Sequence, residues 1–453
     1  MTTILIKNGR VFDGTPQSSK KANVLIEDGI VKSISTKDIP VPIGAKIVDA
    51  SDKWVMPGFI DNHTHYDGEV LVAPGLAESV RHGVTTVMLG GCSLSFIYSN
   101  VDDCCDMFTR VEAFPREVLY PILRDEKTWS TPEEWIQHIH ALPIGPNLAS
   151  FIGHSDIRTA VMGIDRALDK KEKPRPEEVE QMKSLLVQHN PWDKMDGRHW
   201  SKLLPATYAN GAERRALTRI VRERGAHLQG VPNLVSRVAA LWYMWQSASF
   251  FLRKSLKTSM VAMMDLKGDP YIRGILSGLV SIFNKIFKAN FRMQTFPVPF
   301  RVLAEGMELV IFEEFPTGQL ARHLSRDLEK RNATLNDPEY RKRFKRQYKD
   351  KLTPKVWQKD FGDAYVLESP DKSMIGKYFV DLARERNQHP VDTFLDLVVE
   401  MDKDILWETT IGNHDPTRYK PLYNDMSGII GFADSGAHIN NMAFYNFPLR
   451  FLR

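Results

Sequence analysis

The stretch VMPGFIDNHTHYDG, residues 55–68, carries an apolar run that stops on an aspartate and then places two histidines one residue apart. Side chains alternate between the two faces of a strand, so we expect His63 and His65 to point the same way. Two imidazoles at the end of a buried strand are costly unless something binds them. A divalent metal is the first candidate, because neutral imidazole is its commonest protein ligand. Two hydrogen-bonded pocket histidines are the alternative.

Outward from this stretch, apolar segments that end in polar residues alternate with helical segments. Eight strand candidates follow one another at residues 58–65, 84–92, 147–158, 226–232, 258–268, 291–300, 405–415 and 428–438. This alternation predicts an α/β fold of the (β/α)8 TIM-like barrel class. In such a barrel the carboxyl ends of the strands line the active site, and the two histidines lie at one of those ends.

The rest of the chain is organised around this predicted barrel. Residues 1–56 alternate apolar and polar positions between Asn-Gly and Asp-Gly turns, which predicts part of a small β-sandwich, and residues 57–453 form the barrel. We expect insertions around 234–300, which is apolar, and 320–375, which is charged. The first is core, a homo-oligomer interface or a membrane-surface contact; the second is a solvated helix face or a site for an acidic partner. Only 19 residues follow Asp434, so a C-terminally truncated form, lacking the rest of the sandwich, is expected.

The composition limits which classes of partner and which location we expect. The net charge of +4, from 60 basic and 56 acidic residues, argues against a nucleic-acid binder and leaves a small molecule as the expected partner. Three cysteines make no disulfide framework, and no signal peptide precedes them, so a reducing, cytoplasmic location is expected. The apolar run 238–252 is shorter than the roughly 18 residues of a membrane span.

Five further polar residues follow predicted strands. Cys92 comes after two glycines and is either a small buried hydrophobe or, beside a metal, a thiolate ligand. Asp434 is either a helix N-cap or a metal-linked general base. His438 either reaches the same mouth or is solvated on a helix. His154 and Arg158 follow the third strand and, with His438, are the candidates to bind the substrate. Arg158 suits either a substrate carboxylate or a structural salt bridge.

Together these segments resemble the amidohydrolase superfamily, and most closely its N-acyl-D-amino-acid deacylase (D-aminoacylase) branch. The matching stretches are residues 55–68, 83–93, 147–163 and 432–438. The resemblance implies one or two zinc ions, a barrel with a sandwich built from both chain ends, and hydrolysis of an amide bond. It assigns His63, His65, Cys92 and Asp434 to the metal. It also assigns to Asp434 the transfer of a proton from a zinc-activated water to the leaving amine.

The sequence departs from this branch at the fifth and sixth strands, where further metal-binding histidines are expected. The fifth segment offers Asp265 instead, so Asp265 is the expected replacement ligand, and the sixth offers no histidine. Two other functions stay open. One is a cyclic-amide hydrolase of the dihydroorotase or hydantoinase kind, for whose carboxylated lysine Lys267 is the candidate. The other is a non-catalytic barrel that serves as a binding or assembly protein.

Overall fold

The computed structural model describes residues 2–453 except 16, 113, 188–193, 198–204, 232–236, 251–252, 325–326 and 351–355. The chain divides into two compact units, Met1–Phe59 and Ile60–Arg453. The sequence places this boundary after residue 56. Among the described residues, no helix is both long and apolar enough to cross a bilayer.

The N-terminal unit is a single five-stranded sheet. Its strands are β1 (Thr3–Val11), β2 (Lys20–Glu27), β3 (Ile30–Ser35), β4 (Lys46–Asp49) and β5 (Trp54–Val55). They run in the order β3-β2-β1-β4, with β5 also pairing β1. A small core of Val11, Ala22 and Val24 lies on one face, while Ile34 and Ile47 are about half exposed. The described residues of this unit form one sheet, and the β-sandwich stays a prediction.

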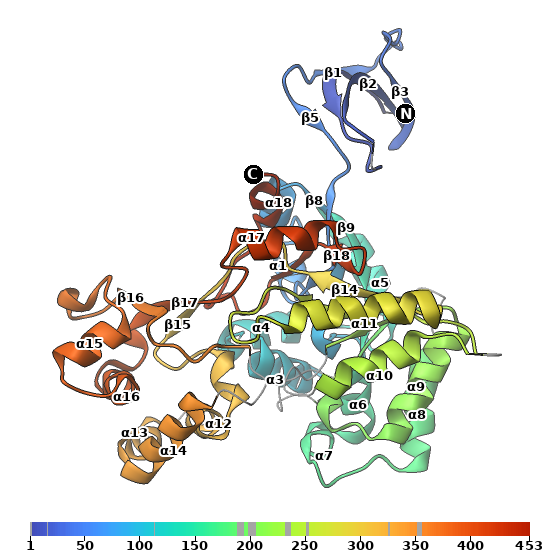
Figure 1. Cartoon of the computed structure of the whole chain (residues 1–453). Coiled ribbons are helices and arrows are strands. Elements are labelled where there is room, and N and C mark those ends of the chain that lie inside the picture. Colours follow the sequence, from blue (N-terminus) through green and yellow to red (C-terminus); the bar gives the residue numbers. More distant parts are fainter. Residues whose placement is uncertain are drawn as a thin grey trace. The chain divides into compact units, whose positions relative to one another are not determined.

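Parallel strands form the framework of the second unit (Figure 1). One sheet has the order β10-β11-β12-β13-β14-β18, and each neighbouring pair is parallel. A second sheet has the order β6-β8-β9, and β19 pairs with β7 in parallel. The strands are β6 (Phe59–Asp61), β7 (His63–Thr64), β8 (Val84–Leu89), β9 (Asn147–Ser150), β10 (Ile152–Gly153), β11 (Lys194–Gly197), β12 (His227–Gly230), β13 (Lys257–Met263), β14 (Asn290–Thr295), β18 (Gly428–Ile430) and β19 (Phe432–Ser435).

Helices separate most of these strands along the chain, as an α/β fold requires. They are α1 (Glu69–Val72), α2 (Ala77–Arg81), α3 (Val101–Val111), α4 (Arg116–Glu126), α5 (Pro132–Ala141), α6 (His154–Met162), α7 (Ile164–Leu168), α8 (Pro176–Val187), α9 (Gly211–Glu223), α10 (Arg237–Ser247), α11 (Ile272–Ile286), α17 (Pro416–Tyr419) and α18 (Phe447–Phe451).

Two expectations about strand order are wrong. Strand β11 lies between β10 and β12 and was not predicted, because Lys-Met-Asp-Gly has no apolar run. The segment 405–415, predicted as a parallel barrel strand, instead contains β17 (Leu406–Gly412). This strand lies antiparallel between β15 (Phe300–Glu305) and β16 (Ala364–Glu368). Its buried side chains Trp407, Thr409 and Ile411 alternate with less buried ones, which suits an antiparallel sheet at least as well as a buried parallel one.

Strands β13 and β14 of the parallel sheet overlap the strand candidates at 258–268 and 291–300 and lie within the segment 234–300, where an insertion is also expected. The segment that departs from the strand–helix alternation runs from 300 to 412. It contains β15–β17 and the helices α12 (Pro316–His323), α13 (Leu328–Asn336), α14 (Pro338–Lys349), α15 (Phe379–Glu385) and α16 (Pro390–Met401). The charged run is α14, whose Tyr340 and Phe344 are buried while Arg341 and Lys345 pair with acidic residues of α16.

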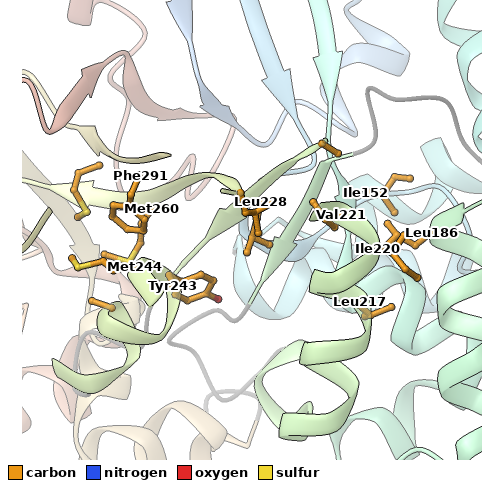
Figure 2. Packing of buried hydrophobic residues seen from close by; sticks show 14 of the residues in the cluster. Ile152, Leu186, Leu217, Ile220, Val221, Leu228, Tyr243, Met244, Met260 and Phe291 are labelled. Atoms are coloured by element: carbon orange, nitrogen blue, oxygen red, sulfur yellow. The ribbon is translucent and has the colours of Figure 1, made fainter. Parts of the chain in front are cut away.

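The main core joins the parallel sheet to the helices after it. Figure 2 shows side chains of α8, α9 and α10 meeting side chains of the strands. Leu217 and Val221 of α9 and Met244 of α10 are at most 2 % exposed, as are Leu228 of β12 and Phe291 of β14. Each fully buried apolar side chain of this size stabilises the fold by roughly 1.5–3 kcal/mol. The first polar residues described next lie in or follow β7, β8 and β19, strands of the two smaller parallel sheets.

Candidate metal centre

Two paired strand ends bring the first histidines and Asp434 together. Strands β7 and β19 are parallel, with His63 opposite Phe432, and the backbone N–H of His65 donates to the carbonyl of Ser435 at 2.8 Å. The buried carboxylate of Asp61 accepts from the Ser435 hydroxyl at 2.7 Å. The sequence could place His63 and His65 on one strand, whereas their pairing with the last strand is a long-range fact that only the fold supplies.

The side chains at this junction converge. His63 Nε2 lies 3.3 Å from Cys92 Sγ and 3.6 Å from Asp434 Oδ1. His65 Nε2 lies 3.2 Å from the same Asp434 oxygen. The potential ligand atoms of His63, His65 and Cys92 all lie within 4.8 Å of one another. The structure therefore brings together four of the five residues that the sequence predicts as metal ligands, all except Asp265.

Two glycines allow Cys92 to come this close. A Cβ on Gly90 would lie 2.3 Å from the Phe151 carbonyl oxygen, and one on Gly91 would lie 2.9 Å from His63 Nε2. Cys92 and Asp434 themselves have positive φ angles of 52° and 57°. Non-glycine residues adopt this conformation at a cost of about 1–3 kcal/mol, and such costs gather at functional sites. The backbone at this junction is thus held in a form that stability alone does not favour.

The donor set fits a zinc ion. Atoms bound tetrahedrally to zinc at about 2.0–2.3 Å lie about 3.3–3.7 Å from one another. The separations of 3.2, 3.3 and 3.6 Å agree with that spacing. His65 Nε2 and Asp434 Oδ1 are also buried without a hydrogen-bond partner. A cation between these atoms would satisfy them, and buried polar atoms without partners are otherwise costly.

Burial and the neighbouring charges shift the pKa values of the histidines and of Asp434 at this site. Burial lowers the pKa of His63 to about 4, which leaves it neutral and suited to bind a metal. Burial also lowers the pKa of His65, but Glu112 and then Asp434 outweigh it and raise the pKa to about 9. For Asp434, burial raises the pKa, yet the neighbouring imidazoles, His65 first, hold it well below its usual value. Asp434 is therefore a carboxylate at neutral pH.

Glu112 is a member of this site that sequence reasoning missed. It follows α3 directly, and its side chain is fully buried. Its Oε1 lies 3.4 Å from His65 Nδ1 and its Oε2 lies 3.5 Å from His438 Nε2. No motif marks it, because it comes from a helix end rather than a strand end. We call His63, His65, Cys92, Glu112 and Asp434 the metal-centre cluster.

A cavity of about 120 Å³ opens beside these residues. His438 lines it together with His63, Cys92 and Asp434, so His438 does reach the predicted mouth. Much of the remaining wall is apolar and includes Phe300 of β15. The cavity therefore combines a polar, chemically active end with an apolar wall.

His154 and Arg158 belong to a different buried group. Both contact the carboxylate of Glu213 on α9: His154 Nε2 lies 2.8 Å from Oε1, and Arg158 donates to Oε2. All three side chains are at most 1 % exposed, and none lines the cavity beside Asp434. We call them the ion-pair cluster. For Arg158 the structure shows the salt-bridge alternative. A substrate carboxylate would have to displace Glu213 to reach Arg158, so the two predicted substrate-binding roles gain no support.

Asp265 likewise pairs with a residue outside the metal-centre cluster. Its two oxygens accept hydrogen bonds from Nε and Nη2 of Arg418, both at 2.8 Å. It is not among the residues whose ligand atoms gather with His63. The expectation that Asp265 replaces a metal-binding histidine came from a strand count that lacked β11. With β11 counted, Asp265 follows the next strand along. Lys267 is paired too, with Asp363 at 2.6 Å.

The chain is similar in sequence to several known proteins. An uncharacterized protein of Mycobacterium tuberculosis is 44% identical over 466 residues, which cover 99% of this chain and 76% of that protein. The N-acyl-D-aspartate deacylase of Alcaligenes xylosoxydans xylosoxydans is 27% identical over 158 residues, 35% of this chain and 29% of the enzyme. No family model matches.

A solved deacylase structure resembles the chain in fold. The zinc- and phosphonate-bound N-acyl-D-glutamate deacylase of Bordetella bronchiseptica superposes with a TM-score of 0.59 at 17% identity, over 94% of this chain and 75% of that one. The chain is therefore similar to the D-aminoacylases and N-acyl-D-amino-acid deacylases, in sequence over about a third of its length and in fold over most of it. The Bordetella bronchiseptica deacylase carries zinc and a phosphonate inhibitor that mimics the tetrahedral intermediate of its reaction, and D-aminoacylase has a binuclear metal center.

Proposed function

We propose that this chain is an amidohydrolase of the D-aminoacylase branch that cleaves the amide bond of an N-acyl-D-amino acid or a related N-acyl compound, on a (β/α)8 barrel that holds one or two zinc ions. The observation that carries the proposal is the convergence of His63, His65 and Cys92 within 4.8 Å, with Asp434 beside both histidines. Zinc bound there would supply a water activated for attack on the amide carbonyl.

The chain's own residues then have distinct tasks. Asp434 is ionised at neutral pH, because the imidazoles around it lower its pKa. It accepts the proton of the attacking water and returns it to the nitrogen of the leaving amine. His63, His65 and Cys92 hold the metal. His438 and the apolar wall, which includes Val302 of β15, face the substrate from the cavity side. The apolar wall favours an acyl part without charge.

A substrate panel tests this proposal. Zinc-loaded protein is expected to hydrolyse N-acyl-D-amino acids or other N-acyl amines, and to leave hydantoins and dihydroorotate intact. Asp434→Asn is expected to lower kcat by about 10²–10⁴-fold, the usual contribution of a general base. Preference for cyclic amides would support the dihydroorotase-like alternative instead. Absence of turnover on every amide, with zinc bound, would support the binding-protein alternative.

A further inference from the structure

The side chain of Glu112 lies where no motif of the sequence placed a functional group. Its backbone is fixed at both ends: its N–H donates to the carbonyl of Phe108 at 2.9 Å, and its carbonyl accepts from the N–H of His438 at 3.0 Å. The carboxylate is 0 % exposed. A buried carboxylate is strongly unfavourable unless it is paired, so this position requires an explanation.

Two imidazoles face this carboxylate. One oxygen lies 3.4 Å from His65 Nδ1 and the other lies 3.5 Å from His438 Nε2. Neither Glu112 oxygen, nor His65 Nδ1, has a hydrogen-bond partner within the described part of the chain, so these two ion-pair distances are their nearest polar contacts given by the structure. The carboxylate is therefore directed at these two rings alone.

The two nitrogens of His65 face different groups. Nε2 lies 3.2 Å from Asp434, on the side of the metal-centre cluster, and Nδ1 lies toward Glu112. A histidine that binds a metal through one nitrogen carries its proton on the other, and a carboxylate that accepts this proton fixes the ring and strengthens the ligand. The geometry of His65 and Glu112 matches that arrangement.

His438 is the second ring that Glu112 contacts. It lines the cavity beside Asp434, and its backbone has a positive φ of 47°. Both the main chain and the side chain of Glu112 contact this residue. The same carboxylate thus touches a ligand-side histidine and a histidine of the cavity wall.

We propose that Glu112 is a positioning residue: one oxygen accepts the Nδ1 proton of His65, and the other holds His438 in the cavity wall. Metal affinity and the placement of a substrate-facing imidazole then depend on one buried carboxylate. The proposal rests on the metal centre of the proposed function and not on its substrate.

The direct test is the metal affinity of Glu112→Gln, which removes the charge and keeps the shape. Zinc affinity is measured by competition with a chelator, and the ligand field by the absorption spectrum of the cobalt(II)-substituted protein. We expect a 10–100-fold loss of affinity and a shifted cobalt spectrum. Glu213→Gln is the matched control, since Glu213 is equally buried and also contacts a histidine, His154. It should leave both readouts unchanged. Wild-type affinity and spectrum in Glu112→Gln would overturn the proposal.

A second measurement needs no variant and settles the matter if Glu112→Gln does not fold. In zinc-loaded wild-type protein, nitrogen-15 NMR of the histidines should find the His65 proton on Nδ1. A His65 that carries no proton on Nδ1 would refute the proposal. Neither readout uses a substrate, so failure of the proposed amide hydrolysis would leave this result standing. His438→Gln should keep zinc affinity within about twofold of wild type, and a 10-fold loss there would contradict the assignment of the ligand effect to His65.

Discussion

Two buried groups of histidine and carboxylate lie in the same unit and differ in how their polar atoms are satisfied. In the ion-pair cluster, Glu213 accepts from His154 and from Arg158, and one Nη of Arg158 is the atom left without a partner. In the metal-centre cluster, six buried atoms lack a hydrogen bond: Nδ1 of His63, both ring nitrogens of His65, both oxygens of Glu112 and Oδ1 of Asp434.

This difference distinguishes the ion-pair cluster, which is a structural group, from the metal-centre cluster, which is a candidate binding site. Unpaired buried polar atoms cost free energy, so a fold retains several of them together where something else completes them. A paired carboxylate such as Glu213 needs no ligand. Both groups begin with motifs that resemble the same enzyme family, so the motif alone does not distinguish them. The hydrogen-bond inventory does.

The largest effect is expected from a variant that breaks the metal-centre cluster. His63→Ala combined with His65→Ala removes two of the proposed ligands, and zinc affinity should fall by about 10⁴-fold or more. Elemental analysis of purified protein measures this directly. His154→Ala is the control and should keep its zinc. A double variant that still binds zinc stoichiometrically would show that the ion lies elsewhere.

The second-largest effect is expected from a variant that breaks the ion-pair cluster. Glu213→Ala leaves the fully buried Arg158 without its carboxylate, which should lower the free energy of unfolding by about 3–5 kcal/mol. Urea denaturation measures this loss. Zinc affinity of the folded variant should stay within about twofold of wild type. Unchanged stability would mean that Arg158 finds another partner and that the cluster is not structural.

A smaller effect concerns Asp265. Asp265→Asn removes the charge that Arg418 pairs with, but Arg418 is 38 % exposed and can be resolvated. The expected loss of stability is therefore only about 1–2 kcal/mol. Zinc content is the decisive readout and should not change. Loss of zinc in this variant would restore Asp265 as a ligand.

The sequence predicted those parts of the site that lie at the ends of apolar strands. His63, His65, Cys92 and Asp434 each follow such a strand, and the structure brings them together. It could not predict Glu112, because a side chain at a helix end carries no periodic signal and its partners are distant along the chain.

The fold was predictable to the same extent. Strands with a strong apolar run were found, whereas the polar β11 was missed, and this omission shifted the count that made Asp265 a ligand. Strand β17 was assigned to the wrong sheet, because an alternating segment does not reveal which neighbours it pairs with.

The smallest expected effect concerns Glu178 of α8, outside both clusters. Hydrogen bonds from Arg166, and further ones from Arg175, hold the pKa of Glu178 at about 2, below its ordinary value of 4.5. Its contribution to stability is therefore present above pH 4.5 and is lost as the pH falls toward 2. Because both arginines are partly exposed, this contribution is below about 1 kcal/mol. Glu178→Gln should flatten that part of the stability profile, and an unchanged acid slope would contradict the assignment.

The most direct test of the whole account is anomalous X-ray diffraction at the zinc edge, on crystals of zinc-loaded protein. The account predicts a peak about 2.0–2.3 Å from His63 Nε2 and Cys92 Sγ, with none at Glu213. A peak beside His154 and Glu213, or an ion that contacts neither His63 nor His65, would contradict it.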